Sequence, residues 1–533
     1  MLASLCGFRV GREGRTDKIP CQRGYGRFEQ KFLNAFRVES PAARCLSILR
    51  QKDRLCIHRM ALCLFNSLHR RVEAFTPLFP DAESIGFYCC GPTVYDFGHI
   101  GNFRTFVFAD LLRRYFEFRG FRVNHVMNIT DVEDKIIRQV AATGLSLAEF
   151  TGQYTEAFLA DLATLSCLRP HHLPKATDYI PQIIDLIQRL ELRGIAYRAG
   201  DGSVYFSINK YRACGCRYGQ LVTLDPEAQR RTERVSGDSY DKDDLADFAL
   251  WKARVPGDGA VFWDSPWGEG RPGWHIECSA MSMAILGPSF DIHLGGEDLA
   301  FPHHEDEIAQ SEGTGLQQPG RPFVKHWVHA AHLLVDGKKM SKSLGNFFTV
   351  RDLLGQGFQG REIRFLLISA HYRETFNFTR EGLEATRSAL ARLDATVAQL
   401  TERAGSVAPE IGTTPSDLEV LFTEALDDDL NVSKAWAVIF DWVRETNASL
   451  TAGSLSPSAA AARLQSWLRV DGVMGLGERP PEKIPAAAMA LLEKRNAAKA
   501  ARDFALADTV RNELKALGWT VEDSKTGSKL KRL

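Results

Sequence analysis

One stretch of the sequence constrains the fold of this chain more than any other. Residues 85–90 read Ile-Gly-Phe-Tyr-Cys-Cys, an apolar run that is typical of a buried strand. Gly91-Pro92 ends this run, and a turn spaced by Gly98 and Gly101 follows. Apolar residues then recur at helical spacing over 103–118. The stretch therefore predicts a strand, a loop and a helix, and the positive end of such a helix can bind an anion.

A second apolar run, 121–131, follows this predicted helix, and Gly120 lies between them. Strand, helix and strand in this order predict a parallel βαβ unit. We therefore expect an α/β fold, with a Rossmann-like doubly wound parallel sheet that carries an insertion and a C-terminal α-helical region after it. Such sheets bind ligands at the carboxyl ends of their strands, where Gly91 and Thr130 would lie.

The 533 residues are too many for a single core, and the sequence pattern divides them into several parts. The sheet domain is expected over 60–335, with a polar insertion at about 170–245. After this insertion, the run Ala249-Leu250-Trp251-Lys252 is expected to restart the core of the sheet. The remaining parts are a lysine-rich loop with a connecting helical segment over 336–400, a helical bundle over 401–480, and a C-terminal region over 481–533.

The first 59 residues differ in character from those that follow. They contain 10 Arg and 3 Lys against 5 acidic residues, and no apolar periodicity persists. One interpretation is an organelle transit peptide, which is typically rich in arginine and poor in acidic residues. The interpretation that we favour is upstream sequence that is not normally translated, with Met60 as the start. Either interpretation excludes residues 1–59 from the fold.

Composition excludes several classes of function. The formal net charge is zero, which argues against nucleic-acid binding through bulk charge. No apolar run approaches the ~20 residues of a membrane span, so no membrane partner is expected. The 11 cysteines are unevenly spaced and predict free or metal-binding thiols rather than a disulfide framework. We therefore expect a cytoplasmic protein.

Four residues suggest a metal site. Cys90 ends the first predicted strand, and Cys278 lies in a second apolar stretch, 274–281. His303 and Glu307 are four residues apart on a predicted helix, so they share one face. Two sulfurs, one imidazole and one carboxylate suit Zn²⁺. In the alternative interpretation both cysteines are small buried hydrophobes, and His303 and Glu307 form a pair on the helix surface. His304 and Glu305 are competing candidates as ligands, but they should project from a different face.

Two further stretches suggest contacts with phosphate. His99 and Asn102 are three residues apart at the start of the predicted helix, so both can reach one anion. Lys339 and Lys342 lie in a glycine-flanked loop, where they would neutralise charge on a leaving pyrophosphate. The alternative interpretations are a capping loop for the first stretch and a solvated basic loop for the second. Neither a P-loop nor a dinucleotide fingerprint occurs.

Taken together, these stretches resemble a known family. His-Ile-Gly-Asn at 99–102, followed by Lys-Met-Ser-Lys-Ser at 339–343, resembles the paired signatures of class I aminoacyl-tRNA synthetases. The runs Cys-Gly-Pro-Thr-Val-Tyr-Asp, Gly-Trp-His-Ile-Glu-Cys-Ser-Ala-Met and Phe-Pro-His-His-Glu-Asp-Glu are similar to those of the cysteinyl-tRNA synthetases. The resemblance extends from about residue 61 to the C-terminus.

The resemblance implies a role for each matching residue. The positions of the family's zinc ligands correspond to Cys90, Cys278, His303 and Glu307, the same four residues that the spacing suggested. Contacts with the amino acid are implied for Gly91, Thr130, Trp274 and His275. ATP contacts are implied for His99, Gly101, Asn102, His293, Gly295, Gly296, Asp298 and Lys342, and catalysis for His99, Asn102, Lys339 and Lys342.

The reaction implied by the resemblance has two steps. The carboxylate of L-cysteine attacks the α-phosphate of ATP, with Mg²⁺, and gives cysteinyl-adenylate. The cysteinyl group is then esterified to the 3′-terminal adenosine of tRNA(Cys). One zinc per chain would bind the cysteine thiolate, and because zinc prefers a thiolate to a serine hydroxyl, no separate editing site is needed. The helical region after residue 400 would bind the tRNA, with 481–533 on the anticodon side, and the chain is expected to be a monomer.

Two residues depart from the family pattern. Asn102 stands where the first signature usually ends in histidine, so this position can donate a hydrogen bond but cannot carry charge. Leu530 stands where an aromatic residue is expected near the C-terminus, which weakens the case for an anticodon contact there. Two other functions stay open: a ligase of the same fold that joins cysteine to a sugar amine, and a non-catalytic zinc module that binds RNA.

Overall fold

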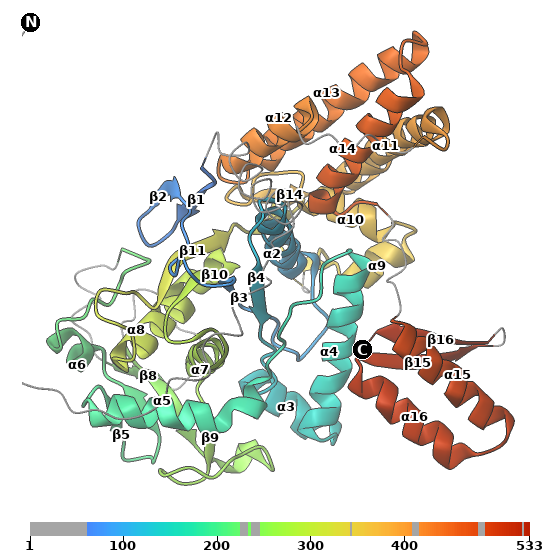
Figure 1. The fold of residues 1–533 in the computed structure, drawn as a ribbon. Coiled ribbons are helices and arrows are strands. Elements are labelled where there is room, and N and C mark those ends of the chain that lie inside the picture. The colour runs from blue at the N-terminus through green and yellow to red at the C-terminus, as the bar shows by residue number, and fades with distance from the viewer. Residues whose placement is uncertain are drawn as a thin grey trace, which may run out of the picture. The chain divides into compact units, whose positions relative to one another are not determined.

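The computed structural model describes residues 61–223, 233–235, 246–341, 344–407, 415–477, 485–524 and 527–532 (Figure 1). All of them belong to one unit of the chain, residues 60–533. The predicted N-terminal extension, 1–59, lies outside the described residues, as does Lys342. Among the described helices, none combines the length and the apolar character needed to cross a membrane.

A four-stranded parallel sheet forms the centre of the fold, in the strand order β11-β10-β3-β4. Its strands are β3 (Ile85–Cys89), β4 (Val123–Met127), β10 (Phe290–Gly296) and β11 (Val324–Ala330). Helix α2 (Ile100–Phe118) crosses from β3 to β4 and completes the predicted βαβ unit. The predicted class of fold is therefore confirmed. A short antiparallel hairpin precedes the sheet, made of β1 (Cys63–Asn66) and β2 (Arg71–Ala74).

The side chains of β3 alternate between two cores, as a strand with both faces buried requires. Phe87 and Cys89 face the core that also contains α2, whereas Tyr88 and Cys90 face a second core. That second core includes residues of α7 (Trp274–Leu286) and α8 (Glu305–Gly313). The two adjacent cysteines therefore lie on opposite faces of the sheet.

Helices and a second sheet connect β4 to β10. The helices are α3 (Asp134–Thr143), α4 (Leu147–Thr164), α5 (Ile180–Leu192) and α6 (Ile208–Ala213). The second sheet has the order β5-β6-β8-β7, with β9 on β8, from β5 (Ala196–Arg198), β6 (Val204–Phe206), β7 (Glu233–Val235), β8 (Ala246–Ala253) and β9 (Gly270–Pro272).

The prediction that residues 249–252 restart the core of the parallel sheet is wrong. These residues belong to β8, which pairs antiparallel with β6 and β9 of the second sheet. The second sheet therefore continues to residue 272, beyond the expected end of the insertion at about 245. A short apolar run predicts a strand but not its partner, because pairing is a tertiary property.

A third, three-stranded sheet carries the start of the lysine loop. Its order is β13-β12-β14, from β12 (Leu333–Val335), β13 (Lys338–Lys339) and β14 (Phe376–Phe378). Asp336 and Gly337 both have positive φ and form the tight turn between β12 and β13. Helices α9 (Val350–Gly355) and α10 (Gly360–Leu367) follow the loop.

The chain is mostly helical after β14, as predicted. The helices are α11 (Arg380–Ala404), α12 (Asp417–Asp427), α13 (Val432–Thr451) and α14 (Pro457–Met474), and both α10 and α14 contact α2. The last residues form α15 (Ala486–Ala500), α16 (Phe504–Ala516) and a hairpin of β15 (Trp519–Ser524) and β16 (Gly527–Arg532). Leu530 packs in the small core of this last part, beside Trp519.

Candidate functional site

The four residues predicted as metal ligands lie together in the structure. Cys90 follows β3, Cys278 lies one turn into α7, and His303 and Glu307 come from the start of α8 and the turn before it. Their ligand atoms all lie within 4.8 Å of one another, and all four residues are buried. Glu307 Oε1 is 3.1 Å from His303 Nε2 and 3.8 Å from Cys90 Sγ.

These separations fit one tetrahedral ion. Zinc bonds of about 2.0–2.3 Å imply ligand atoms about 3.3–3.8 Å apart. The donor set of two sulfurs, one imidazole and one carboxylate is also one that zinc prefers. Of the two interpretations of these residues, the helix-surface pair is excluded, because His303 and Glu307 are both buried.

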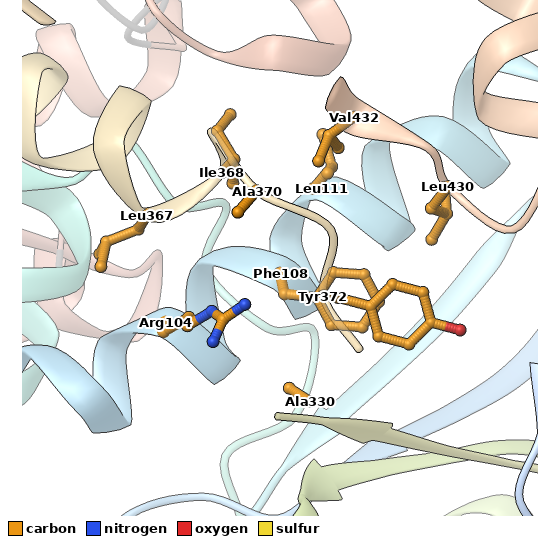
Figure 2. Close-up of a pocket in the computed structure, with 10 residues that line it drawn as sticks. All are labelled: Arg104, Phe108, Leu111, Ala330, Leu367, Ile368, Ala370, Tyr372, Leu430 and Val432. Carbon is orange, nitrogen blue, oxygen red and sulfur yellow. The ribbon is translucent and has the colours of Figure 1, made fainter. Parts of the chain in front are cut away.

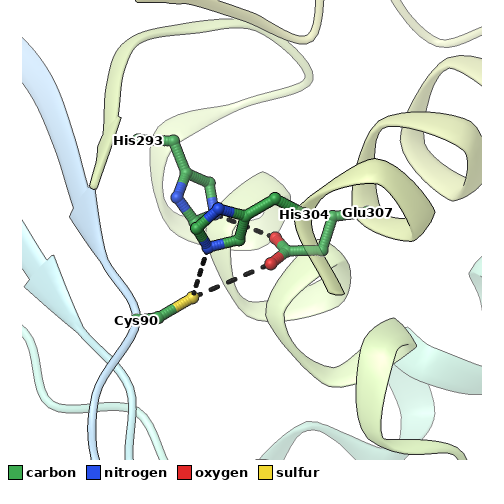
Figure 3. A group of neighbouring side chains, drawn as sticks. All are labelled: Cys90, His293, His304 and Glu307. Atoms are coloured by element: carbon green, nitrogen blue, oxygen red, sulfur yellow. Dashed lines mark hydrogen bonds and ion pairs between the residues drawn. The ribbon is translucent and has the colours of Figure 1, made fainter. Parts of the chain in front are cut away.

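A second group of potential ligands overlaps the first and shares Cys90 and Glu307 with it. It adds His293 of β10 and His304, as Figure 3 shows. His304 Nε2 lies 3.4 Å from Cys90 Sγ, and His293 Nε2 lies 2.9 Å from Glu307 Oε2. The two groups share two donors, Cys90 and Glu307.

The prediction that His304 projects away from the cluster is wrong. Side chains at neighbouring helical positions point about 100° apart. The side chains of His303 and His304 are nevertheless long enough for both rings to reach the cluster. Gly295 makes room for this ring, since a Cβ there would lie 2.5 Å from His304 Cε1. Glu305 does project elsewhere, as expected. Its carboxylate accepts hydrogen bonds from the backbone N–H groups of residues 219–221.

Charge is concentrated in this cluster. A hydrogen bond with Cys90 lowers the pKa of Cys278 to about 6 despite its burial. Burial alone would lower the pKa of His303, but hydrogen bonds with Cys278 and Glu307 raise it to about 10. Burial would raise the pKa of Glu307, yet the charge of His293 and hydrogen bonds from both histidines lower it to about 2. The three shifts all favour the charged forms of these side chains, and a cluster that favours buried negative charge on sulfur and oxygen suits a divalent cation.

The residues predicted to contact the amino acid surround this cluster. The Trp274 ring lies 4.4 Å from that of His303, centroid to centroid, and His275 Nδ1 lies 2.9 Å from His303 Nδ1. The Gly91 backbone N–H donates to the side chain of Asn128, which in turn donates to Thr130 Oγ1. A Cβ at Gly91 would lie 1.7 Å from the Asn128 carbonyl oxygen, so only glycine fits there.

The predicted phosphate stretch forms the start of α2. His99 is the N-cap residue, and its Nδ1 accepts from the Asn102 backbone N–H at 3.2 Å. The Asn102 side chain accepts from the His99 backbone N–H at 3.1 Å, which completes a capping box. Asn102 therefore has a structural role that explains an uncharged residue at this position. The interpretation as a capping loop is correct, and it leaves His99 Nε2 available for a ligand.

The lysine loop meets this helix start. A Cβ at Gly101 would lie 3.4 Å from Met340 Cε, so the two stretches are in contact there. The Ile100 backbone N–H also donates to the Phe348 carbonyl at 2.9 Å. Lys339 is exposed, while Lys342 lies outside the described residues.

The loop after β10 approaches the same helix start. Asp298 is close enough to His99 to raise the pKa of that imidazole, although burial lowers it more. A Cβ at Gly296 would lie 2.4 Å from Asp298 Oδ1. His293, predicted on the ATP side, has its side chain in the cysteine-histidine-glutamate cluster.

The sequence did not point to His329, a histidine that lies beside His304. His304 Nδ1 lies 2.8 Å from His329 Nε2, and His329 Nδ1 lies 2.7 Å from Ser67 Oγ. Burial lowers the pKa of His329 to about 3, so this ring is neutral. Its position near the carboxyl end of β11 is a signal that could have found it, because ligands of parallel sheets bind at that edge.

Comparisons with known proteins agree with this geometry. A family model described as "tRNA synthetases class I (C) catalytic domain" matches residues 78–388. Cysteine–tRNA ligase of Chlamydia muridarum is 47% identical over 486 residues, which cover 89% of this chain and 100% of the relative. The chain belongs to the cysteinyl-tRNA synthetase family. The enzyme of Protochlamydia amoebophila is 42% identical over 480 residues and covers 89% of this chain and 99% of its own.

Two further family models match the C-terminal part. A DALR domain matches residues 421–477, and a cysteinyl-tRNA ligase anticodon-binding domain matches 482–528. Among solved structures, methionyl-tRNA synthetase of Mycobacterium tuberculosis in complex with methionyl-adenylate has a TM-score of 0.53 at 14% identity. That likeness covers 74% of this chain and 92% of the neighbour, and it supports the class I fold of this family.

Proposed function

We propose that this chain is a cysteine–tRNA ligase. It activates L-cysteine with ATP and Mg²⁺ to cysteinyl-adenylate and transfers the cysteinyl group to the 3′-terminal adenosine of tRNA(Cys). One observation carries the proposal: a buried cysteine-histidine-glutamate cluster and two ATP signatures meet at the same edge of a parallel sheet. The relatives that this chain matches over their whole length bear the same name.

We propose that one zinc is held by Cys90, Cys278, His303 and Glu307. The support is the donor set, the mutual distances within 4.8 Å and the charge of a thiolate and a carboxylate buried together. Bound there, zinc would supply a ligand position for the thiolate of cysteine and thereby discriminate against serine. In this proposal Trp274 and His275 orient the ion's ligand His303, and Gly91 and Thr130 line the approach of the amino acid.

The ATP side follows from the start of α2. His99 Nε2 and the N–H groups of the first turn would bind phosphate oxygens, with the positive helix end adding to the attraction. Lys339 and Lys342 would stabilise the charge that develops on the leaving pyrophosphate. Gly295, Gly296 and Asp298 would line the adenosine side. Catalysis in this scheme is positioning and charge stabilisation, without a covalent intermediate on the protein.

The C-terminal match separates this proposal from the sugar-amine ligase. The DALR and anticodon-binding models match residues 421–477 and 482–528, which a ligase that acts on a small amine does not need. Leu530 packs against the core of its own module, so no anticodon contact is assigned to it. The cytoplasmic location and the monomeric state stay predictions.

Two assays test the proposal. Cysteine-dependent exchange of pyrophosphate into ATP should occur with the chain alone, and serine should support it far more weakly. Attachment of labelled cysteine to tRNA(Cys) should follow. Exchange without attachment to tRNA, but with transfer to a sugar amine, would favour the rival ligase. A chain that binds RNA without any exchange would be the non-catalytic module.

A further inference from the structure

One buried arginine connects the two ATP signatures. Arg104 lies two residues after Asn102 on α2, and only 2% of its surface is exposed. Its Nη1 donates to the carbonyls of Ala331 and His332 at 2.9 and 2.7 Å. Its Nη2 donates to the carbonyls of His371 and Glu374 at 3.0 and 2.6 Å. A single guanidinium thus holds four carbonyl groups from two separate segments.

Both segments lead into the sheet that carries the lysine loop. Residues 331–332 directly precede β12, whose hairpin partner β13 ends at Lys339. Residues 371–374 precede β14, the parallel partner of β12. Arg104 therefore ties the base of this three-stranded sheet to the helix that begins with the first signature. The position of the lysine loop relative to His99 depends on this tie.

Arginine suits this position for geometric reasons. Its planar guanidinium has five N–H donors in a rigid fork, whereas lysine has three donors on one nitrogen. Burying a charge is expensive unless every donor is paired, and the partners here are carbonyl oxygens. An apolar side chain of similar size would fill the same volume without this cost, but it would not fix the two segments.

The helical bundle holds residues 371–374 from the other side. Tyr372 and Arg373 both donate to the carboxylate of Asp429, which lies between α12 and α13. Figure 2 shows Arg104, Tyr372 and Leu430 around a cavity of about 10 Å³, which is no larger than a single water requires. Because the junction is closely packed, a movement of residues 371–374 would also displace the residues that pack against them.

We propose that Arg104 is a positioning residue for the activation step, which holds the lysine loop in register with the start of α2. This inference rests on the proposed function. Arg104 touches neither substrate nor reacting atoms. It acts through the sheet of β12, β13 and β14, in which β13 ends at Lys339, three positions before Lys342 in the sequence.

The first test is Arg104→Lys, measured by cysteine-dependent pyrophosphate exchange. A displacement of the loop by about 1 Å should lower kcat by about 10- to 100-fold, while the KM for cysteine and the bound zinc stay near those of the parent. Arg114→Lys is the matched control. Arg114 lies on the same helix and donates to the carbonyls of Ser166 and Gly472, away from the lysine loop. Its substitution should change kcat less than twofold.

The decisive test is a double-variant cycle with Lys342→Ala. If Arg104 acts by positioning the loop, Arg104→Lys should lower kcat much less in the Lys342→Ala background than in the parent. If the double variant loses kcat by the product of the two single-variant factors, the proposal is overturned, because Arg104 then has only a general structural role. Arg104→Gln, which removes the buried charge, is carried through the same cycle so that the result does not depend on the folding of one variant.

The proposed function can fail separately from this inference. A parent protein without cysteine-dependent exchange contradicts the function. A parent with exchange and a multiplicative cycle contradicts only the role of Arg104. Unchanged exchange in Lys342→Ala removes the lysine loop from the reaction, and the positioning role of Arg104 with it.

Discussion

Asp429 offers the sharpest test of how the helical bundle is joined to the sheet domain. The residue is 3% exposed, and its side chain accepts three kinds of donor. Oδ1 accepts from the Phe65 backbone N–H at 2.7 Å and from the Tyr372 hydroxyl at 2.6 Å. Oδ2 accepts from the Arg373 guanidinium at 2.7 Å. Two segments of the chain, β1 and residues 372–373, are therefore tied through one carboxylate to the segment between α12 and α13.

The structure gives different expectations for two substitutions. Asp429→Asn keeps an oxygen for Phe65 and Tyr372 and loses the ion pair with Arg373, together with the longer contact between Oδ2 and His371 Nε2 at 3.7 Å. Because the Arg373 side chain is 38% exposed, we expect a loss of only about 1 kcal/mol in the free energy of unfolding. Asp429→Ala also leaves two donors without an acceptor, at about 1–3 kcal/mol each, so its total loss should be about 3–7 kcal/mol.

Urea unfolding, monitored by circular dichroism, measures the loss in free energy of unfolding for both variants. The neighbouring Asp428 is exposed, so Asp428→Ala is the matched control and should change the free energy of unfolding by no more than about 0.5 kcal/mol. Equal losses for Asp429→Asn and Asp429→Ala would refute the reasoning. Such a result would mean that leaving the Phe65 N–H and the Tyr372 hydroxyl without an acceptor does not lower the free energy of unfolding.

Three further predictions concern the site and its support. Cys278→Ser should lose zinc and the preference for cysteine over serine, and full zinc content by elemental analysis would contradict the ligand assignment. Gly91→Ala should abolish activity or folding, since its Cβ would lie 1.7 Å from the Asn128 oxygen; a fully active variant would show that the loop can shift. Although burial raises the pKa of Asp110, the charges of Arg364 and Arg114 lower it below 3.8. Its contribution to stability is therefore present above pH 3.8 and lost as the pH falls below that value, and Asp110→Asn should flatten this acid limb in unfolding measurements.

The sequence predicted the elements with strong periodicity. Residues 103–118 were expected as a helix and lie in α2, and the run 85–90 contains the central strand β3. Cys90, Cys278, His303 and Glu307 were also brought together as expected. Spacing on one helix and the edge rule for parallel sheets suggested this group, because both follow from backbone geometry, and the family resemblance implied the same four residues.

Other features depend on tertiary contacts and could not be predicted from the sequence. The partner of β8 is set by long-range pairing, which a short apolar run does not specify. His304 reaches Cys90 because Gly295 leaves room for its ring, and no local pattern encodes that. The tie between Arg104 and four carbonyls joins residues more than 220 positions apart, so the sequence showed only an arginine on a helix.

The distribution of the metal cluster along the chain has a consequence for biosynthesis. Cys90 and His304 are separated by 214 residues, and the whole second sheet is made between them. Contacts over such distances form late in folding, because loop closure must be completed before they contribute. A nascent chain that ends before residue 307 has an incomplete site. Any metal that the cluster takes up can therefore meet its full set of ligands only after residue 307 has been made.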